Sequence, residues 1–95
     1  MEQGKKIWID GELLDWKDAN IHFVSNSFHY GFSVFEGIRA YKTDKGSAVF
    51  RLNAHIKRLF DSAKIIGLDI PFTQQQLIDA CCETIVANDY EQCYI

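Results

Sequence analysis

Apolar and polar residues alternate around the dipeptide Asp10-Gly11, within the run KKIWIDGELLDW. Asp-Gly between two alternating runs is typical of a tight β-hairpin, because both turn residues need a positive φ. The pattern therefore predicts strands at about residues 6–9 and 12–14.

A second alternating run, SVFEGIRAYKT at residues 33–43, is followed across Asp44-Lys45-Gly46 by the short run SAVF at 47–50. This arrangement predicts a second hairpin. Gly37 lies inside its first strand without a turn partner, which indicates a bulge or a close approach of backbone.

The apolar spacing then becomes helical, which predicts a helix at residues 54–66. Asn53 is a suitable N-cap, and Gly67 lies where a left-handed C-terminal cap is expected. The residues expected on its buried face are Leu52, Ile56, Leu59, Phe60, Ala63 and Ile66.

Thr73 followed by Gln76 has the pattern of a capping box and predicts a second helix from about Gln74 to Ala87. Asn88 is expected to end this helix, and the residues EQCYI predict a final strand.

Together these elements predict an α+β fold, in which an antiparallel sheet from two β-hairpins plus a trailing strand packs against two helices. The 95 residues are expected to form one small domain. The last strand has no turn or polar tail after it, so we expect the domain to be incomplete at its C-terminus.

Composition excludes several classes of function. The net charge is −3 and the pI is near 5.5, so nothing resembles the basic surface of a nucleic-acid-binding protein. Neither a leader segment nor an apolar run of membrane-spanning length is present, which favours a cytoplasmic protein. Cys81, Cys82 and Cys93 lack metal-ligand spacing and are expected to be reduced thiols.

Two places could carry chemistry. Arg58 lies on its helix beside Ser62 and Ile65, and is either a solvated arginine packed on Ile65 or an anion site that grips a phosphate. In the strand, Phe35, Gly37 and Arg39 are expected on one face, and Glu36, Ile38 and Ala40 on the other. The first face is a plausible wall for a ligand with an apolar body and a carboxylate, whereas His29 is more typical of a structural histidine.

Three motifs, HYGFSVFEGIRAY, VFRLNAHIKRLFDSAKI and CYI, closely resemble the N-terminal domain of the fold-type IV, pyridoxal-phosphate-dependent aminotransferases. The upstream run IWIDGELLDWKDANIHFVSNSFHYG resembles the same family, so the resemblance covers nearly all of the chain. The most similar subgroup is branched-chain amino-acid aminotransferase. The segment FEGIRAY separates it from sister activities, which usually have YGDG where this chain has Tyr30-Gly31-Phe32-Ser33.

The resemblance implies a role for each of six residues. Arg58 corresponds to the arginine that holds the cofactor phosphate. Tyr30 corresponds to a tyrosine that closes the substrate pocket of the neighbouring subunit, and Tyr94 to one near the substrate carboxylate. The positions that line the side-chain pocket are Phe35, Gly37 and, with a less defined role, Arg39.

The implied reaction is transamination of leucine, isoleucine or valine with 2-oxoglutarate, in a homodimer or a higher homo-oligomer. None of the chain's lysines corresponds to the family's catalytic lysine, which is expected in a larger domain beyond residue 95. No catalytic residue is therefore assigned here, and the chain alone is expected to be inactive. The alternative is a non-catalytic domain, derived from this family, that dimerises or binds a partner through an exposed strand edge.

Overall fold

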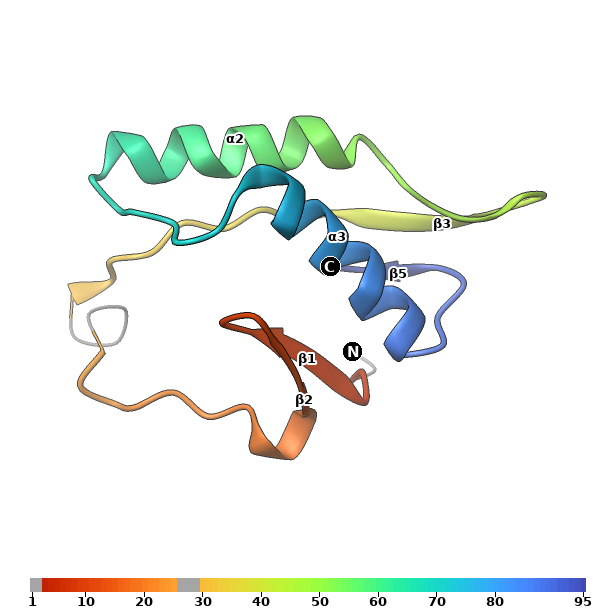
Figure 1. The fold of residues 1–95 in the computed structure, drawn as a ribbon, viewed down its shortest axis with the longest axis horizontal. Coiled ribbons are helices and arrows are strands. Elements are labelled where there is room, and N and C mark those ends of the chain that lie inside the picture. The colour runs from red at the N-terminus through yellow and green to blue at the C-terminus, as the bar shows by residue number, and fades with distance from the viewer. Residues whose placement is uncertain (1–2, 26–29) are drawn as a thin grey trace.

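The structure is a computed structural model, and it describes residues 3–25 and 30–95. Its described elements form two antiparallel sheets, one with β1 and β2 and one with the order β4-β3-β5 (Figure 1). In chain order they are β1 (Lys6–Ile9), β2 (Glu12–Asp15), the 3-10 helix η1 (Trp16–Asp18), β3 (Arg39–Thr43), β4 (Gly46–Val49), α2 (Leu52–Ile65), α3 (Gln74–Ala87) and β5 (Cys93–Tyr94).

The first hairpin follows the local pattern closely. Asp10 has a φ of 49° and Gly11 a φ of 94°, as a tight two-residue turn requires. The strands pair from Lys6 with Asp15 to Ile9 with Glu12, so the second strand ends one residue later than predicted.

The second hairpin forms as predicted, but its loop is one residue shorter than predicted and its first strand starts later. Only a two-residue loop separates Thr43 from its partner Gly46. We predicted a strand from residue 33, whereas β3 begins at Arg39. A strand forms only where a neighbouring strand pairs with it. Ile38 exchanges backbone hydrogen bonds of 2.9 and 2.7 Å with Ile95, and among the described residues no strand pairs with residues 33–37.

The start of α2 differs from the prediction, while the predicted C-terminal cap at Gly67 is confirmed. The helix begins at Leu52, and its N-cap is Arg51 with a φ of 52°, so the assignment of Asn53 as the cap was wrong. Leu52 is buried in the core, and this burial brings it into the first turn. At the other end Gly67 has a φ of 72°, and the Leu68 N–H donates to the Ala63 carbonyl over 2.8 Å in a Schellman arrangement.

Helix α3 has the predicted bounds. The Gln76 N–H donates to Thr73 Oγ1 over 3.1 Å, and the Thr73 N–H donates to Gln76 Oε1 over 2.8 Å, which completes the capping box. Asn88 ends the helix as predicted, although its side chain has a further role in packing.

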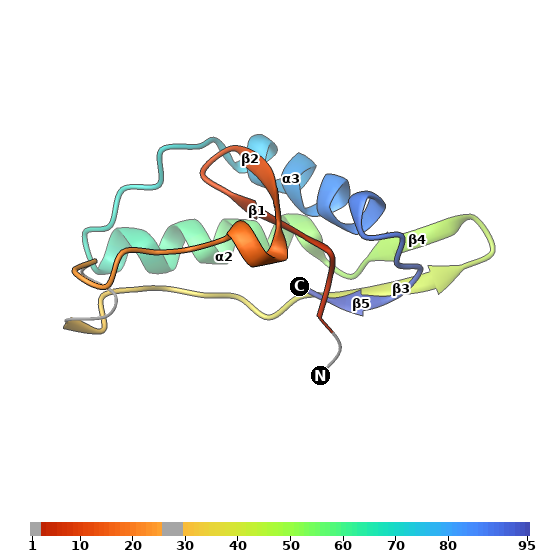
Figure 2. The ribbon, with the colours of Figure 1, turned by 90° about the horizontal axis from the view of Figure 1, so that it is seen from below.

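The core lies between α2, α3 and the three-stranded sheet. It is centred on Ile38, Leu52 and Ile56, and the partly buried residues packed against it are Val49, Phe60, Leu77, Ile78, Cys81 and Ile95. The chain leading into β3 runs alongside α2, while the β3–β4 hairpin extends past both helices (Figures 1 and 2).

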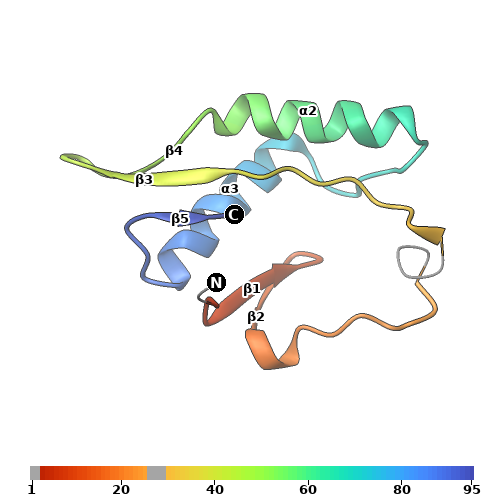
Figure 3. The same ribbon diagram turned by 180° about the vertical axis from the view of Figure 1, so that it is seen from behind.

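We predicted that both hairpins and the last strand form one sheet, and this was wrong. The first hairpin forms a sheet of its own and packs on α3 (Figure 3). The contact depends on Asn88, which is only 7% exposed. Its Oδ1 accepts from the Lys6 N–H over 2.8 Å, and its Nδ2 donates to the Lys6 carbonyl over 3.0 Å. Side-chain bonds thus attach the hairpin where strand pairing does not.

No described helix has both the length and the apolar character needed to span a membrane. The three cysteines are free, and burial raises the pKa of the Cys81 and Cys93 thiols.

Candidate functional site

The segment from Phe35 to Ala40 presents two chemically different faces, as its alternation predicts. Phe35 is 84% exposed, whereas Ile38 and Ala40 are buried. The side chain of Glu36, on the same face as Ile38, is only 7% exposed because it meets residues of α2.

Tyr94 lies directly over Gly37 on the face that also carries Phe35 and Arg39. A Cβ at Gly37 would lie 2.5 Å from Tyr94 Oη and 3.2 Å from Cε2 and Cζ of the ring. Antiparallel pairing of Arg39 with Tyr94 brings the tyrosine to this position. The glycine therefore accommodates an aromatic side chain, not the backbone approach or bulge that the sequence suggested.

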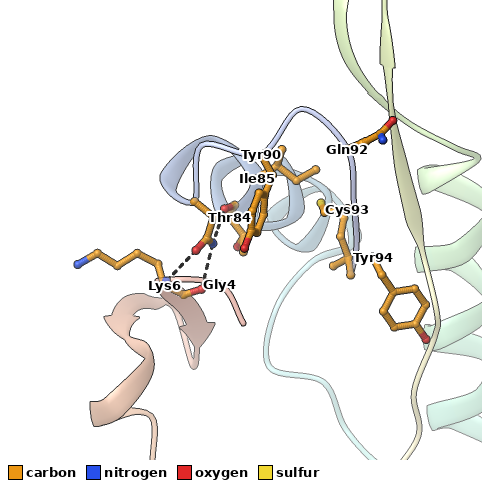
Figure 4. Close-up of a pocket in the computed structure, with 10 residues that line it drawn as sticks. Gly4, Lys6, Thr84, Ile85, Tyr90, Gln92, Cys93 and Tyr94 are labelled. Carbon is orange, nitrogen blue, oxygen red and sulfur yellow. Dashed lines mark hydrogen bonds between the residues drawn. The ribbon is translucent and has the colours of Figure 1, made fainter. Parts of the chain in front are cut away.

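Beside β5 there is also a largely apolar hollow of about 330 Å³. Thr84, Ile85 and Tyr90 line it, and the ring of Tyr94 points away from them (Figure 4). Tyr94 is the one predicted site residue in its lining.

On the opposite face, Glu36, His55 and Arg58 form a hydrogen-bonded group that we call the Glu36 cluster. Arg58 grips the carboxylate in bidentate fashion, with Nε donating to Oε2 over 2.8 Å and Nη2 to Oε1 over 2.7 Å. His55 Nδ1 lies 2.7 Å from the same Oε1. His55 and Arg58 are three residues apart on α2 and so project to one side of it.

These hydrogen bonds stabilise the ionised forms of Glu36 and Arg58. The hydrogen bond from Arg58, followed by that from His55, lowers the pKa of the Glu36 carboxyl from 4.5 to about 2. Glu36 in turn raises the pKa of the Arg58 guanidinium. Because an ionised carboxylate only accepts hydrogen bonds, Nδ1 of His55 carries the hydrogen at neutral pH.

A hollow of about 330 Å³ adjoins the Glu36 cluster and is lined by Arg51, Ala54, His55 and Arg58. The Arg58 side chain is 67% exposed, and its Nη1 makes no hydrogen bond to the described residues. Two guanidinium groups and an imidazole at one hollow suit an anion such as a phosphate.

The structure separates the predicted site residues into two groups. Gly37, Arg39 and Tyr94 come together, with Phe35 on the same face, whereas Arg58 lies on the helix side of the segment. Tyr30 is 82% exposed. His29 is one of residues 26–29, which lie outside the described residues.

Sequence reasoning missed Glu36 and His55 as partners of Arg58. The predicted alternation placed Glu36 on the face opposite Phe35. His55 was given no role, although it lies three residues before Arg58 on the predicted helix. Those two signals together could have suggested the contact.

The profile of the family described as amino-transferase class IV matches residues 33–95, about two thirds of the chain. This chain belongs to the class IV aminotransferases. The family match takes in Arg58, Tyr94 and the whole segment that carries Phe35, Gly37 and Arg39.

Curated members of the class IV aminotransferases match nearly all of the chain. The branched-chain-amino-acid aminotransferase of Pseudomonas aeruginosa is 47% identical over 89 residues, which are 94% of this chain and 29% of that protein. The enzyme of the same name from Escherichia coli K12 is 45% identical over 89 residues, with the same two shares. The chain thus spans about 30% of the length of the curated relatives it matches.

Solved structures that resemble this chain come from the same group of enzymes as its curated relatives. The T.th. branched-chain amino acid aminotransferase, in complex with N-(5'-phosphopyridoxyl)-L-glutamate, superposes with a TM-score of 0.95 at 42% identity. That match covers 99% of this chain and 32% of the other. The Escherichia coli enzyme gives a TM-score of 0.94 at 42% identity, over 97% of this chain and 30% of the other. These matches confirm the predicted α+β class and the resemblance to fold-type IV aminotransferases.

Proposed function

We propose that this chain forms the N-terminal part of a branched-chain amino-acid aminotransferase, which transfers the amino group of leucine, isoleucine or valine to 2-oxoglutarate. The observation that carries the proposal is the match with enzymes of that name over 94% of the chain at 45–47% identity. The superposition on a relative complexed with a phosphopyridoxyl amino acid supports pyridoxal phosphate as the cofactor.

The residues at Arg58 fit a phosphate group. Glu36 occupies the Nε and Nη2 side of the guanidinium, and the N–H groups of Nη1 remain for an anion at the hollow beside Arg51 and His55. We propose that Arg58 binds the phosphate of pyridoxal phosphate. When bound, the cofactor supplies the electron sink that transamination requires.

The opposite face fits an apolar substrate side chain. Phe35 presents an exposed ring, and Gly37 leaves room for the ring of Tyr94. We propose that Phe35 and Gly37 line the pocket for the side chain, with Arg39 farther along the same lining segment, and that Tyr94 lies toward the substrate carboxylate. Tyr30 would complete the pocket of a second subunit in a homodimer.

The 95 residues are proposed as the small domain of a two-domain, cytoplasmic enzyme, in which the larger domain supplies the catalytic lysine. Intact-mass measurement checks this division of roles after mixing the chain with pyridoxal phosphate and reducing with borohydride. We expect scattered, substoichiometric adducts. One stoichiometric adduct on a single lysine would contradict the proposal, because it would place a competent lysine in this chain.

The proposed activity is tested in a chimera, in which this chain replaces the matching N-terminal segment of the Escherichia coli enzyme. We expect a dimer that retains pyridoxal phosphate and transaminates leucine with 2-oxoglutarate. Arg58→Ala should weaken cofactor retention with little change in amino-acid preference, whereas the neighbouring variant Lys57→Ala should retain the cofactor. A folded chimera without leucine transamination would contradict the proposed function.

A further inference from the structure

We infer that Glu36 and His55 are positioning residues that hold the Arg58 guanidinium in one orientation, with its Nη1 left for an anion. The inference rests on the proposed function, in which Arg58 binds the cofactor phosphate. It gives Glu36 and His55 roles beyond that proposal: Glu36 holds the guanidinium, and His55, which also lines the hollow, holds Glu36.

The distribution of burial supports this role. The Glu36 side chain is 7% exposed, whereas the Arg58 side chain that it binds is 67% exposed. A long arginine side chain at such exposure samples many rotamers unless a partner restrains it. The bidentate contact to a buried carboxylate supplies that restraint, because planar pairing fixes direction as well as distance.

His55 restrains the carboxylate itself. Its Nδ1 donates to Oε1 over 2.7 Å, so Oε1 receives both His55 and Arg58 Nη2 while Oε2 receives Arg58 Nε. The His55 side chain is 20% exposed and comes from the same helix as Arg58. A rotation of Glu36 would break bonds to both partners at once.

Charge alone does not explain a carboxylate in this place. A negative group against Arg58 weakens the attraction of the guanidinium for an anion, so a site built for attraction alone would omit it. Orientation and attraction therefore predict opposite effects of Glu36→Gln on anion affinity. Loss of a carboxylate that orients a binding group weakens affinity by about 10–100-fold at metal sites. Removal of a like charge at an exposed site would instead tighten binding by up to about fivefold.

The test uses the 95-residue chain labelled with ¹⁵N and inorganic phosphate as the probe. The Arg58 Nε–H resonance reports whether the guanidinium is held, and a phosphate titration gives the dissociation constant. In the unchanged chain we expect a sharp Nε–H signal that exchanges slowly with solvent. Glu36→Gln should abolish that signal and weaken phosphate binding about tenfold, while the backbone spectrum shows that the fold persists.

Matched variants separate orientation from charge and from stability. Asp61→Asn removes one negative charge from the exposed Lys57–Asp61 pair of the same helix, and should leave the Arg58 signal unchanged. His55→Ala should weaken both the Arg58 Nε–H signal and phosphate binding, whereas His55→Asn, which keeps an N–H donor near the Nδ1 position, should restore most of both. The His55 variants also provide the test if Glu36→Gln fails to fold.

The outcomes distinguish the inference from the proposed function. Unchanged or tighter phosphate binding in Glu36→Gln would overturn the positioning role, and so would an Arg58 signal that is absent from the unchanged chain. An Arg58 side chain held by Glu36, in a chain that does not bind phosphate, would instead count against the proposed phosphate role of Arg58.

Discussion

The attachment of the first hairpin to α3 depends on Asn88, and we predict that Asn88→Ala destabilises the chain substantially. The side chain makes three hydrogen bonds: from the Lys6 N–H at 2.8 Å, to the Lys6 carbonyl at 3.0 Å, and to the Thr84 carbonyl at 2.8 Å. The Thr84 carbonyl also accepts from the Asn88 backbone N–H at 3.2 Å, so it keeps a partner in the variant. The loss therefore falls on the two backbone groups of Lys6.

Each buried polar group left without a partner costs about 1–3 kcal/mol. Lys6 is only partly buried, which places each group toward the lower end, and the expected loss is about 2–4 kcal/mol in total. Domains of this length have unfolding free energies on the order of 5–14 kcal/mol, so the loss is a large fraction of the whole.

Urea unfolding followed by circular dichroism measures the change in unfolding free energy, and hydrogen exchange reports on the Lys6 amide. Asn53→Ala is the matched control, because Asn53 is exposed and makes no capping bond. That control should change stability by less than about 0.5 kcal/mol. If Asn88→Ala were no more destabilising than Asn53→Ala, Asn88 would not be what attaches the hairpin.

Three further predictions concern single residues. Gly37→Ala places a methyl group 2.5 Å from Tyr94 Oη, so the tyrosine ring must move; we expect altered ring resonances in NMR spectra and a raised KM for leucine in the chimera, and unchanged Tyr94 signals would contradict this. Glu36 has a folded pKa of about 2 against an ordinary 4.5, so the stability it contributes is present above about pH 4.5 and is lost as the pH falls through about 2. The unfolding midpoints of the unchanged chain and of Glu36→Gln should therefore converge as the pH falls from 5 to 2. A difference between the two midpoints that stays constant with pH would refute the lowered pKa of Glu36. Gly67→Ala forces a Cβ into a φ of 72°, which should cost about 1 kcal/mol and lower Tm by about 4–8 °C; an equal or higher Tm would show that the cap relaxes.

Some features of this fold could be predicted because their causes lie within a few residues. The Asp10-Gly11 turn, the capping box of Thr73 and the C-cap at Gly67 all depend on backbone and side-chain groups three to five positions apart. Their outcome does not require knowledge of the rest of the chain.

Element starts were less predictable where packing or pairing decides them. Asn53 has a stronger N-capping propensity than Arg51. Burial of Leu52 nevertheless starts α2 one residue before Asn53, so that Arg51 becomes the N-cap. Likewise β3 begins at Arg39 because β5 pairs with only a few residues of that segment. Nothing local to residues 33–38 specifies where a partner strand 55 residues or more away will end.

The sequence by itself determined the α+β class, the two hairpins, the two helices and the faces of the segment from Phe35 to Ala40. Its motifs also indicated the aminotransferase family. Only the tertiary structure decided that the hairpins belong to separate sheets, that Tyr94 covers Gly37, and that Glu36 joins Arg58 and His55. The physical reason is that side-chain periodicity gives the direction in which a residue points, whereas the residue it meets depends on how distant elements pack together.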